Sequence, residues 1–219
     1  TVLTDEQKEQ ITGAEVFDSL FGVFDGMAST LEENQGYFGE GDSLHWIFHD
    51  NGELTISGDG PMPDGPDLPW AEYSSKIITL VIGSGVTSIG ANAFYSYPAL
   101  TSVTIPKDVT SIGANAFYNC SALTSVNIPE GSALQTIGSS AFYYCIKLNN
   151  ISIPASVTSI EGEAFQGCST LTSITIPEGV TEIRDKAFWD CSALTGITIP
   201  QGVTKIGANA FYNCTSLVT

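Results

Sequence analysis

The five cysteines and two histidines of this sequence are the side chains that could take part in catalysis, metal binding or disulfide formation. His45 and His49 could each act as a general base, but a base must stand within hydrogen-bond reach of the group that it deprotonates. No cysteine or serine nucleophile pairs with either histidine in a catalytic pattern. The sequence therefore predicts no catalytic residues, and we expect a protein that is not an enzyme.

The five cysteines recur at one position of a repeating unit, a position that is Tyr97 in the first copy. Zinc sites use closely spaced cysteine pairs together with histidines, and this chain has no C-x2-C pair. A column of small apolar side chains predicts burial, so we expect free structural thiols. Cross-links between neighbouring copies are the alternative if their Cβ atoms reach disulfide distance. The cysteines are Cys120, Cys145, Cys168, Cys191 and Cys214.

Three aspartates in a Pro- and Gly-rich stretch raise the question of a calcium site. Asp59, Asp64 and Asp67 lack the D-x-D-x-D-G spacing and the distal glutamate of an EF-hand loop. We therefore expect neither a metal nor a cofactor.

The cysteines belong to a unit that repeats through most of the chain and is represented by VTSIGANAFYNCSALTSVNI. A phenylalanine marks each copy, at steps of 23, 25, 23, 23 and 23 residues. Self-similarity at such a step is typical of a solenoid. The markers are Phe94, Phe117, Phe142, Phe165, Phe188 and Phe211.

Each copy contains a short alternating segment in which Val103 and Ile105 point inward and Ser102 and Thr104 point outward. A proline such as Pro106 ends the segment by removing a backbone donor. We predict a leucine-rich-repeat solenoid with one short parallel strand per coil of about 23 residues and short helical or irregular returns. Two extra residues near positions 132–134 are expected to form an outward loop.

The chain divides into three predicted parts. Residues 1–35 carry a helical apolar stripe that includes Phe17, Leu20 and Phe24, and this helix either docks on its own domain or binds a partner. Residues 36–76 form a cap, in which HWIFHDNGELTIS predicts a β-hairpin about Asn51-Gly52 after a turn-rich linker. Trp70 and Tyr73 are expected to cover the open end of the array. Residues 77–219 form about six coils, the last one incomplete.

Charge and hydropathy limit the possible partners. The formal charge is −17, of which residues 1–76 contribute −14. Nucleic acids and anionic membranes require basic patches, so we expect neither as a partner. The sequence has no run of 18 apolar residues, so we expect no membrane insertion. The chain starts TVLTDEQ, without an initiator methionine or signal peptide, and we expect a mature or trimmed fragment.

The pattern L-x-x-[IV]-x-I-P-x-x-V-x-x-I-G-x-x-A-F-x-x-C resembles the BspA-like, treponemal-type leucine-rich repeat of bacterial surface proteins. Residues 44–85, with LTISGDGPMPD, Pro69-Trp70 and IGSGVTSIG, resemble the cap that often precedes those repeats. The resemblance covers about residues 44–219. It implies a secreted or surface-attached protein that binds host or matrix proteins or other bacteria, and it supplies no catalytic residues.

Two sets of side chains are candidates for ligand binding. The first, here called the strand face, is small, polar and uncharged; its alternative role is a solvated sheet surface. It comprises Ser102, Thr104, Ser125, Asn127, Asn150, Ser152, Ser173, Thr175, Gly196 and Thr198. The second, here called the aromatic column, follows each marker phenylalanine; its alternative role is half-buried stacking of coil on coil. It comprises Tyr95, Tyr118, Tyr143, Gln166, Trp189 and Tyr212.

The sequence thus favours a non-enzymatic extracellular adhesion module that recognises a host or matrix protein or a surface glycan through its repeat faces. The alternative is a structural spacer that displays another domain of a longer protein. Because Leu217-Val218-Thr219 begins a further strand, we expect a monomer or a weak dimer formed through that end.

Overall fold

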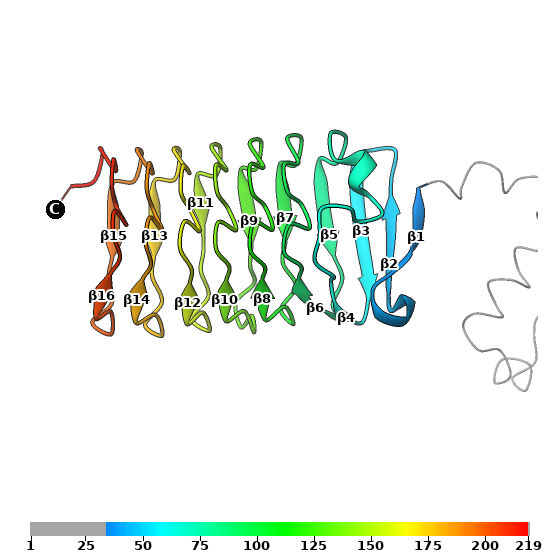
Figure 1. The fold of residues 1–219 in the computed structure, drawn as a ribbon, viewed down its shortest axis with the longest axis horizontal. Coiled ribbons are helices and arrows are strands. Elements are labelled where there is room, and N and C mark those ends of the chain that lie inside the picture. The colour runs from blue at the N-terminus through cyan, green and yellow to red at the C-terminus, as the bar shows by residue number, and fades with distance from the viewer. Residues whose placement is uncertain (1–33, 219) are drawn as a thin grey trace, which may run out of the picture. The chain divides into compact units, whose positions relative to one another are not determined.

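The computed structural model describes residues 34–218, which form a solenoid of coils stacked one behind the other (Figure 1). The predicted helical segment lies outside the described residues, except for Asn34 and Gln35. The leucine-rich-repeat solenoid predicted from the marker phenylalanines is confirmed.

One side of every coil contributes a strand to a nine-stranded main sheet. The antiparallel pair β2–β3 is the predicted cap hairpin, and every later neighbour in this sheet pairs in parallel. The order along the sheet is β1 (Gln35–Phe38), β2 (Leu44–Phe48), β3 (Glu53–Gly58), β5 (Thr79–Ile82), β7 (Ser102–Thr104), β9 (Ser125–Asn127), β11 (Asn150–Ile151), β13 (Ser173–Thr175) and β15 (Gly196–Thr198).

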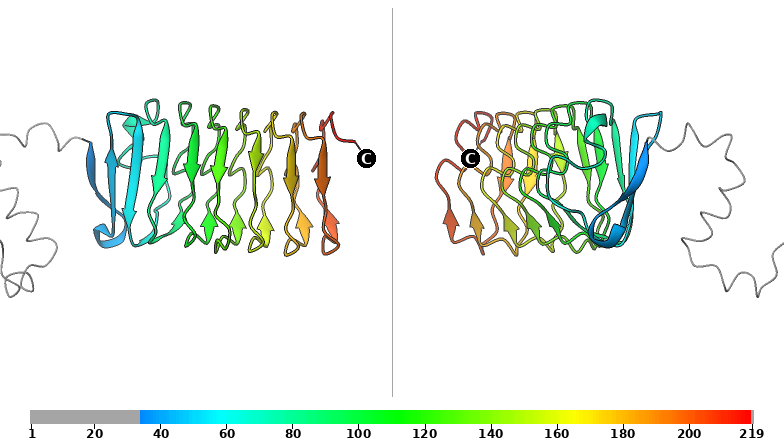
Figure 2. Two further views of the ribbon diagram at one scale, coloured as in Figure 1. Left: turned by 180° about the vertical axis from the view of Figure 1, so that it is seen from behind. Right: turned by 45° about the vertical axis from the view of Figure 1, so that its right-hand side comes forward.

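A second strand in each coil was not predicted. The V-x-x-I segment after the proline is extended, and its backbone pairs in parallel with the same segment of the next coil, as in Ser111↔Thr136. These strands follow one another along the row of coils (Figure 2). The second ladder contains β4 (Gly60–Pro61), β6 (Val86–Ile89), β8 (Ser111–Ile112), β10 (Thr136–Ile137) and β12 (Ser159–Ile160), and a separate pair contains β14 (Glu182–Ile183) and β16 (Lys205–Ile206).

The returns between the ladders are irregular, and the helical option is wrong for the described residues. Each return turns at left-handed residues, such as Asn115 (φ 55) and Asn119 (φ 55), and asparagine tolerates that conformation better than most residues. The backbone amides then bond to the next coil: Phe94 donates to the Ala116 carbonyl at 2.8 Å, and Phe117 to Ala141 at 2.8 Å. The 3-10 turns η2 (Glu40–Asp42) and η3 (Ala71–Tyr73) lie in the cap.

The core is a continuous stack of the marker phenylalanines. Their ring centroids lie 5.4 to 5.6 Å apart, and neighbouring rings are within 10° of parallel. Each repeat cysteine donates its thiol to the phenylalanine carbonyl of the preceding coil, at 3.2 Å from Cys120 to Phe94. All five cysteines are free. The prediction of structural thiols holds because the position accommodates a small donor against a carbonyl.

The cap closes the first coil with aromatic rings. Trp70 is buried and stacks on Phe94 with centroids 5.8 Å apart, and Tyr73 stacks on Phe48 at 4.6 Å. The segment predicted to be a turn-rich linker instead contains β1, which extends the main sheet beyond β2.

The two-residue insertion is only partly an outward loop. Gly131 and Ala133 are exposed, but Ser132 and Leu134 are buried. Leu134 takes the position that Val109 holds in the preceding coil, so its side chain fills the core. Register resumes at Thr136↔Ser111, as predicted.

Replacing a central phenylalanine should destabilise the array far more than replacing the last one. Phe142→Ala would leave a cavity in a fully buried stack and should cost about 3–5 kcal/mol. Phe211→Ala is the matched control, because Phe211 is partly exposed and, among the described residues, stacks on Phe188 alone. Urea unfolding followed by circular dichroism measures both; equal losses would contradict the stacked core.

The native chain should expose at most one reactive thiol. Burial raises the pKa of Cys120 to about 12 and raises the pKa values of Cys145 and Cys168 well above the ordinary range, so these thiols are neither accessible nor ionised. Cys214 is half-buried. A disulfide reagent at mild alkaline pH should modify Cys214 slowly in the native chain and all five cysteines in guanidinium. Rapid native modification of two or more thiols would contradict this packing.

Candidate functional site

The structure places the predicted strand face along one side of the main sheet. Neighbouring coils bring its members into register, for example Thr104↔Asn127, Asn150↔Ser173 and Thr175↔Thr198. Ser102 is half-buried and the other nine positions are exposed. Strands in a sheet lie about 4.8 Å apart, so the hydroxyl and amide groups form closely spaced rows.

The polar side chains of the strand face differ from the threonines beside them in their hydrogen bonding. Thr101, Thr124, Thr172 and Thr195, at the start of the strand segments, donate their hydroxyls to carbonyls of the preceding coil. By contrast, no strand-face side chain has a hydrogen-bond partner among residues 34–218. The threonines at the start of the strand segments therefore join coils, while the strand-face side chains present donors and acceptors to solvent.

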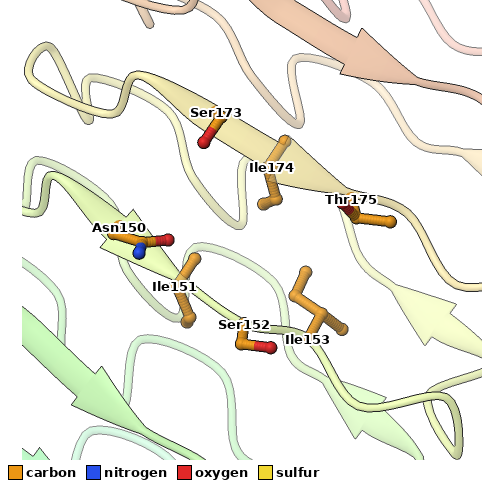
Figure 3. Close-up of a pocket in the computed structure, with 7 residues that line it drawn as sticks. All are labelled: Asn150, Ile151, Ser152, Ile153, Ser173, Ile174 and Thr175. Atoms are coloured by element: carbon orange, nitrogen blue, oxygen red, sulfur yellow. The ribbon is translucent and has the colours of Figure 1, made fainter.

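A shallow groove opens in the strand face between β11 and β13. Pairing there stops after Asn150↔Ser173, whereas β13 and β15 remain paired through Thr175↔Thr198. The groove has a volume of about 260 Å³ and combines isoleucine side chains with four polar groups (Figure 3). It is lined by Asn150, Ile151, Ser152, Ile153, Ser173, Ile174 and Thr175. This combination suits a ligand that has both an apolar surface and hydroxyl or amide groups.

The aromatic column is a stack of rings rather than a row of open ring faces. Tyr118 lies between Tyr95 and Tyr143, with centroids 4.6 Å apart on both sides and interplanar angles of 6° and 5°. Partial burial raises the pKa values of Tyr118 and Tyr143, and the neighbouring phenols add to the effect. The ring faces are used in stacking, so what this stack presents outward is ring edges and neutral hydroxyls.

The structure does not bring all members of the aromatic column together. Gln166 interrupts the stack and donates its amide to the Tyr143 hydroxyl at 3.4 Å. The column resumes with Trp189 and Tyr212, whose centroids lie 4.3 Å apart at 32°. It therefore forms two separate groups, three tyrosines on one side of Gln166 and two rings on the other.

Tyr144 extends the tyrosine group, and neither Tyr144 nor Ile146, two residues later, was predicted. Both are exposed, and the Tyr144 ring lies 4.8 Å from that of Tyr143. Tyr144 has φ 55, a conformation that is uncommon for a bulky residue. Gly167 makes room for it, because a Cβ atom there would lie 2.8 Å from the Tyr144 ring. The sequence signal that could have identified Tyr144 is its residue type, because the equivalent position one coil earlier is Asn119.

The strand face also continues into the cap, which was not predicted. Thr79 and Val81 pair with Glu53 and Thr55 in the same register. His49 contacts the Thr55 hydroxyl through Nε2 at 3.2 Å, and burial lowers the pKa of His45. The alternation in HWIFHDNGELTIS predicted the inward residues of the hairpin. The same alternation identifies Glu53 and Thr55 as outward residues.

Two further properties of residues 34–218 concern metal-ligand clusters and membrane-spanning helices. This part of the chain holds no cluster of three or more histidine, cysteine or acidic side chains arranged for a metal ion. It also contains no helix with the length and apolarity to cross a bilayer.

Known proteins of similar structure are bacterial leucine-rich repeat proteins. The structure of one from T. pallidum superposes with a TM-score of 0.68 and 23% identity, covering 80% of this chain and 88% of the other, and supports the fold alone. One from Eubacterium ventriosum has a TM-score of 0.55, 27% identity and coverage of 81% and 63%. A leucine-rich cell surface protein from Faecalibacterium prausnitzii has a TM-score of 0.53, 33% identity and coverage of 84% and 54%.

The chain thus spans 63% and 54% of the last two relatives. No curated protein matches it. Residues 87–218, more than half of the chain, match the family model described as a BspA type leucine-rich repeat region, in six copies. This family points to a repeat module of the protein-binding kind. The chain belongs to the BspA-type leucine-rich repeat family.

Proposed function

We propose that this chain is a non-enzymatic, extracellular binding module of a bacterial surface or secreted protein, and that it recognises a host or matrix protein or a surface glycan through the strand face. The observation that carries the proposal is the row of exposed hydroxyl and amide groups that have no hydrogen-bond partner within residues 34–218. The groove between β11 and β13 is the centre of this surface, because apolar and polar groups meet there. The Faecalibacterium relative is described as a cell surface protein, which supports the proposed location.

Binding at this surface is weak per site and gains strength from repetition. A hydrogen bond that replaces one to water contributes only about 0.5–1.5 kcal/mol, and the strand face lacks the tryptophan and arginine anchors of strong protein interfaces. Several equivalent contacts on one array raise the overall affinity without new chemistry. Since the surface is uncharged, binding should depend little on salt.

A structural spacer is the second candidate function. The observation that favours it is the unbroken phenylalanine stack from Phe94 to Phe211, which gives a continuous core suited to holding other parts of a protein apart. In either role the proposed division of the chain is the same: residues 1–35 as an N-terminal helical segment, residues 36–76 as the cap and residues 77–219 as the repeat array.

The last described coil supports a proposal on self-association. Within residues 34–218, Ile199, Ile206 and Val218 are 40%, 52% and 76% exposed, and β15 and β16 each pair with one strand. Paired edges of two copies would cover these groups, so the chain is proposed to be a monomer in equilibrium with a weak dimer.

Removing the polar groups of the groove should abolish most binding. The variant N150A/S152A/S173A/T175A should weaken binding to any positive member of a panel of matrix proteins and neutral glycans by about tenfold or more, equivalent to 1.4 kcal/mol. The matched control T158A/T181A removes two exposed hydroxyls away from the strand face. Surface plasmon resonance at two salt concentrations measures both variants.

Equal affinity of the groove variant and the control for a positive panel member would place the binding surface elsewhere. A second variant, Y118A/Y143A/W189A, then tests the aromatic column. A chain that binds no member of the panel would favour the spacer.

A further inference from the structure

The boundary between the coil of β11 and β12 and the coil of β13 and β14 lacks backbone pairing along a continuous arc. In the main sheet, pairing between β11 and β13 ends at Asn150↔Ser173. The second ladder ends at β12, and β14 pairs only with β16. Pairing resumes in the return, where Glu163 donates to the Asp185 carbonyl at 3.0 Å. The unpaired arc therefore runs from the groove, through the turns after Pro154 and Pro177, to the end of the second ladder.

Individual amides show the same break. At the preceding boundary, Thr158 donates to Gln135 at 2.9 Å and Glu161 to Ile137 at 2.9 Å. The equivalent donors at this boundary are the amides of Thr181 and Arg184, and neither has an acceptor within residues 34–218. One boundary later, Thr204 donates to Thr181 at 2.9 Å.

The repeat position after the isoleucine of V-x-x-I explains the break. It is glycine in four coils because neighbouring coils touch there: a Cβ atom on Gly113 would lie 2.5 Å from the Ala91 nitrogen, and one on Gly138 would lie 2.7 Å from the Ala114 nitrogen. Glu161 and Arg184 occupy the same position in two successive coils. The coil of Gly138 accommodates the Glu161 side chain, since the Glu161 amide still donates to Ile137 at 2.9 Å.

Ion pairs also connect the two coils at this boundary. Arg184 Nε lies 3.7 Å from Glu161 where backbone bonds are missing, and Lys186 Nζ lies 3.0 Å from Glu163 where backbone pairing has resumed. These side chains are 36% to 46% exposed, and ion pairs in such positions add little net stability. The pairs therefore connect the coils without restoring the rigidity of a backbone ladder.

We propose that Glu161 and Arg184 hold this boundary open and act as positioning residues for the groove, so that the array consists of two backbone-paired stacks joined at a flexible seam. The stacks remain connected by the Phe165–Phe188 contact, with centroids 5.6 Å apart, and by the return. Bending at the seam changes the separation of Ser152 and Thr175 across the groove. The inference concerns conformation, and it stands whether or not the groove binds a ligand.

Amide hydrogen exchange of the full chain tests the seam directly. In the unaltered protein, the Thr181 and Arg184 amides should exchange about tenfold or more faster than those of Thr158 and Glu161, after correction for intrinsic rates. Equal protection of the two pairs would overturn the inference without any variant.

Two matched double variants separate the steric cause from the charges. E161G/R184G removes the Cβ atoms. The amides at positions 181 and 184 should then be protected from exchange to the same degree as those at positions 158 and 161. E161A/R184A removes the charges but keeps the Cβ atoms, so it should leave them unprotected. Protection in the alanine variant would overturn the steric explanation.

The converse variant guards against a failure of the glycine variant to fold. Gly138→Ala places two side chains at successive copies of this position and should release the Thr158 and Glu161 amides, creating a second seam. Full protection of those amides in a folded Gly138→Ala chain would also overturn the inference.

Discussion

Every feature of this structure depends on the close stacking of one coil on the next. Neighbouring coils meet through phenylalanine rings 5.4 to 5.6 Å apart and through backbone bonds near 2.8 Å in the returns. No coil buries its own apolar face, so the core exists only between coils. This constraint selects phenylalanine for the centre, a small thiol beside its carbonyl and asparagine at left-handed turns. It leaves the outward strand positions unconstrained.

The distinction between constrained and unconstrained polar residues is the basis of the functional proposal. Thr101 and Ser102 are neighbours of similar chemistry, yet the Thr101 hydroxyl bonds to the Ile78 carbonyl and Ser102 has no partner within the described residues. A repeated hydroxyl is thus not by itself a binding group. Only those that the stack does not use can exchange water for a ligand, and the strand face is a continuous row of such groups. The aromatic column shows the opposite case, since its ring faces are already occupied by one another.

Much of the fold could be predicted from the sequence, because the spacing of Phe94 and its equivalents fixes the coil length and the alternation about Val103 fixes the inward side. The second ladder could not, since a two-residue strand such as Ser111–Ile112 has no alternation of its own and forms only against a neighbouring coil. The left-handed returns were missed for a similar reason: Ser140 and Lys186 adopt the same conformation as Asn115 without sharing its preference. In the proposed account, the groove depends on Glu161 and Arg184, which hold the boundary between two successive coils open. An inspection of each repeat by itself does not reveal this effect.

The central claim is that ligands bind the unconstrained polar side chains of the strand face. Side-chain amide NMR signals during titration with a ligand from the binding panel test it most directly. The signals of Asn127 and Asn150, whose side chains are exposed and have no hydrogen-bond partner in the described part of the chain, should shift with ligand concentration. Those of Asn115, which donates to Asn92 at 3.2 Å, should not move. Shifts confined to Asn115, or to residues beside the aromatic column, would contradict the account.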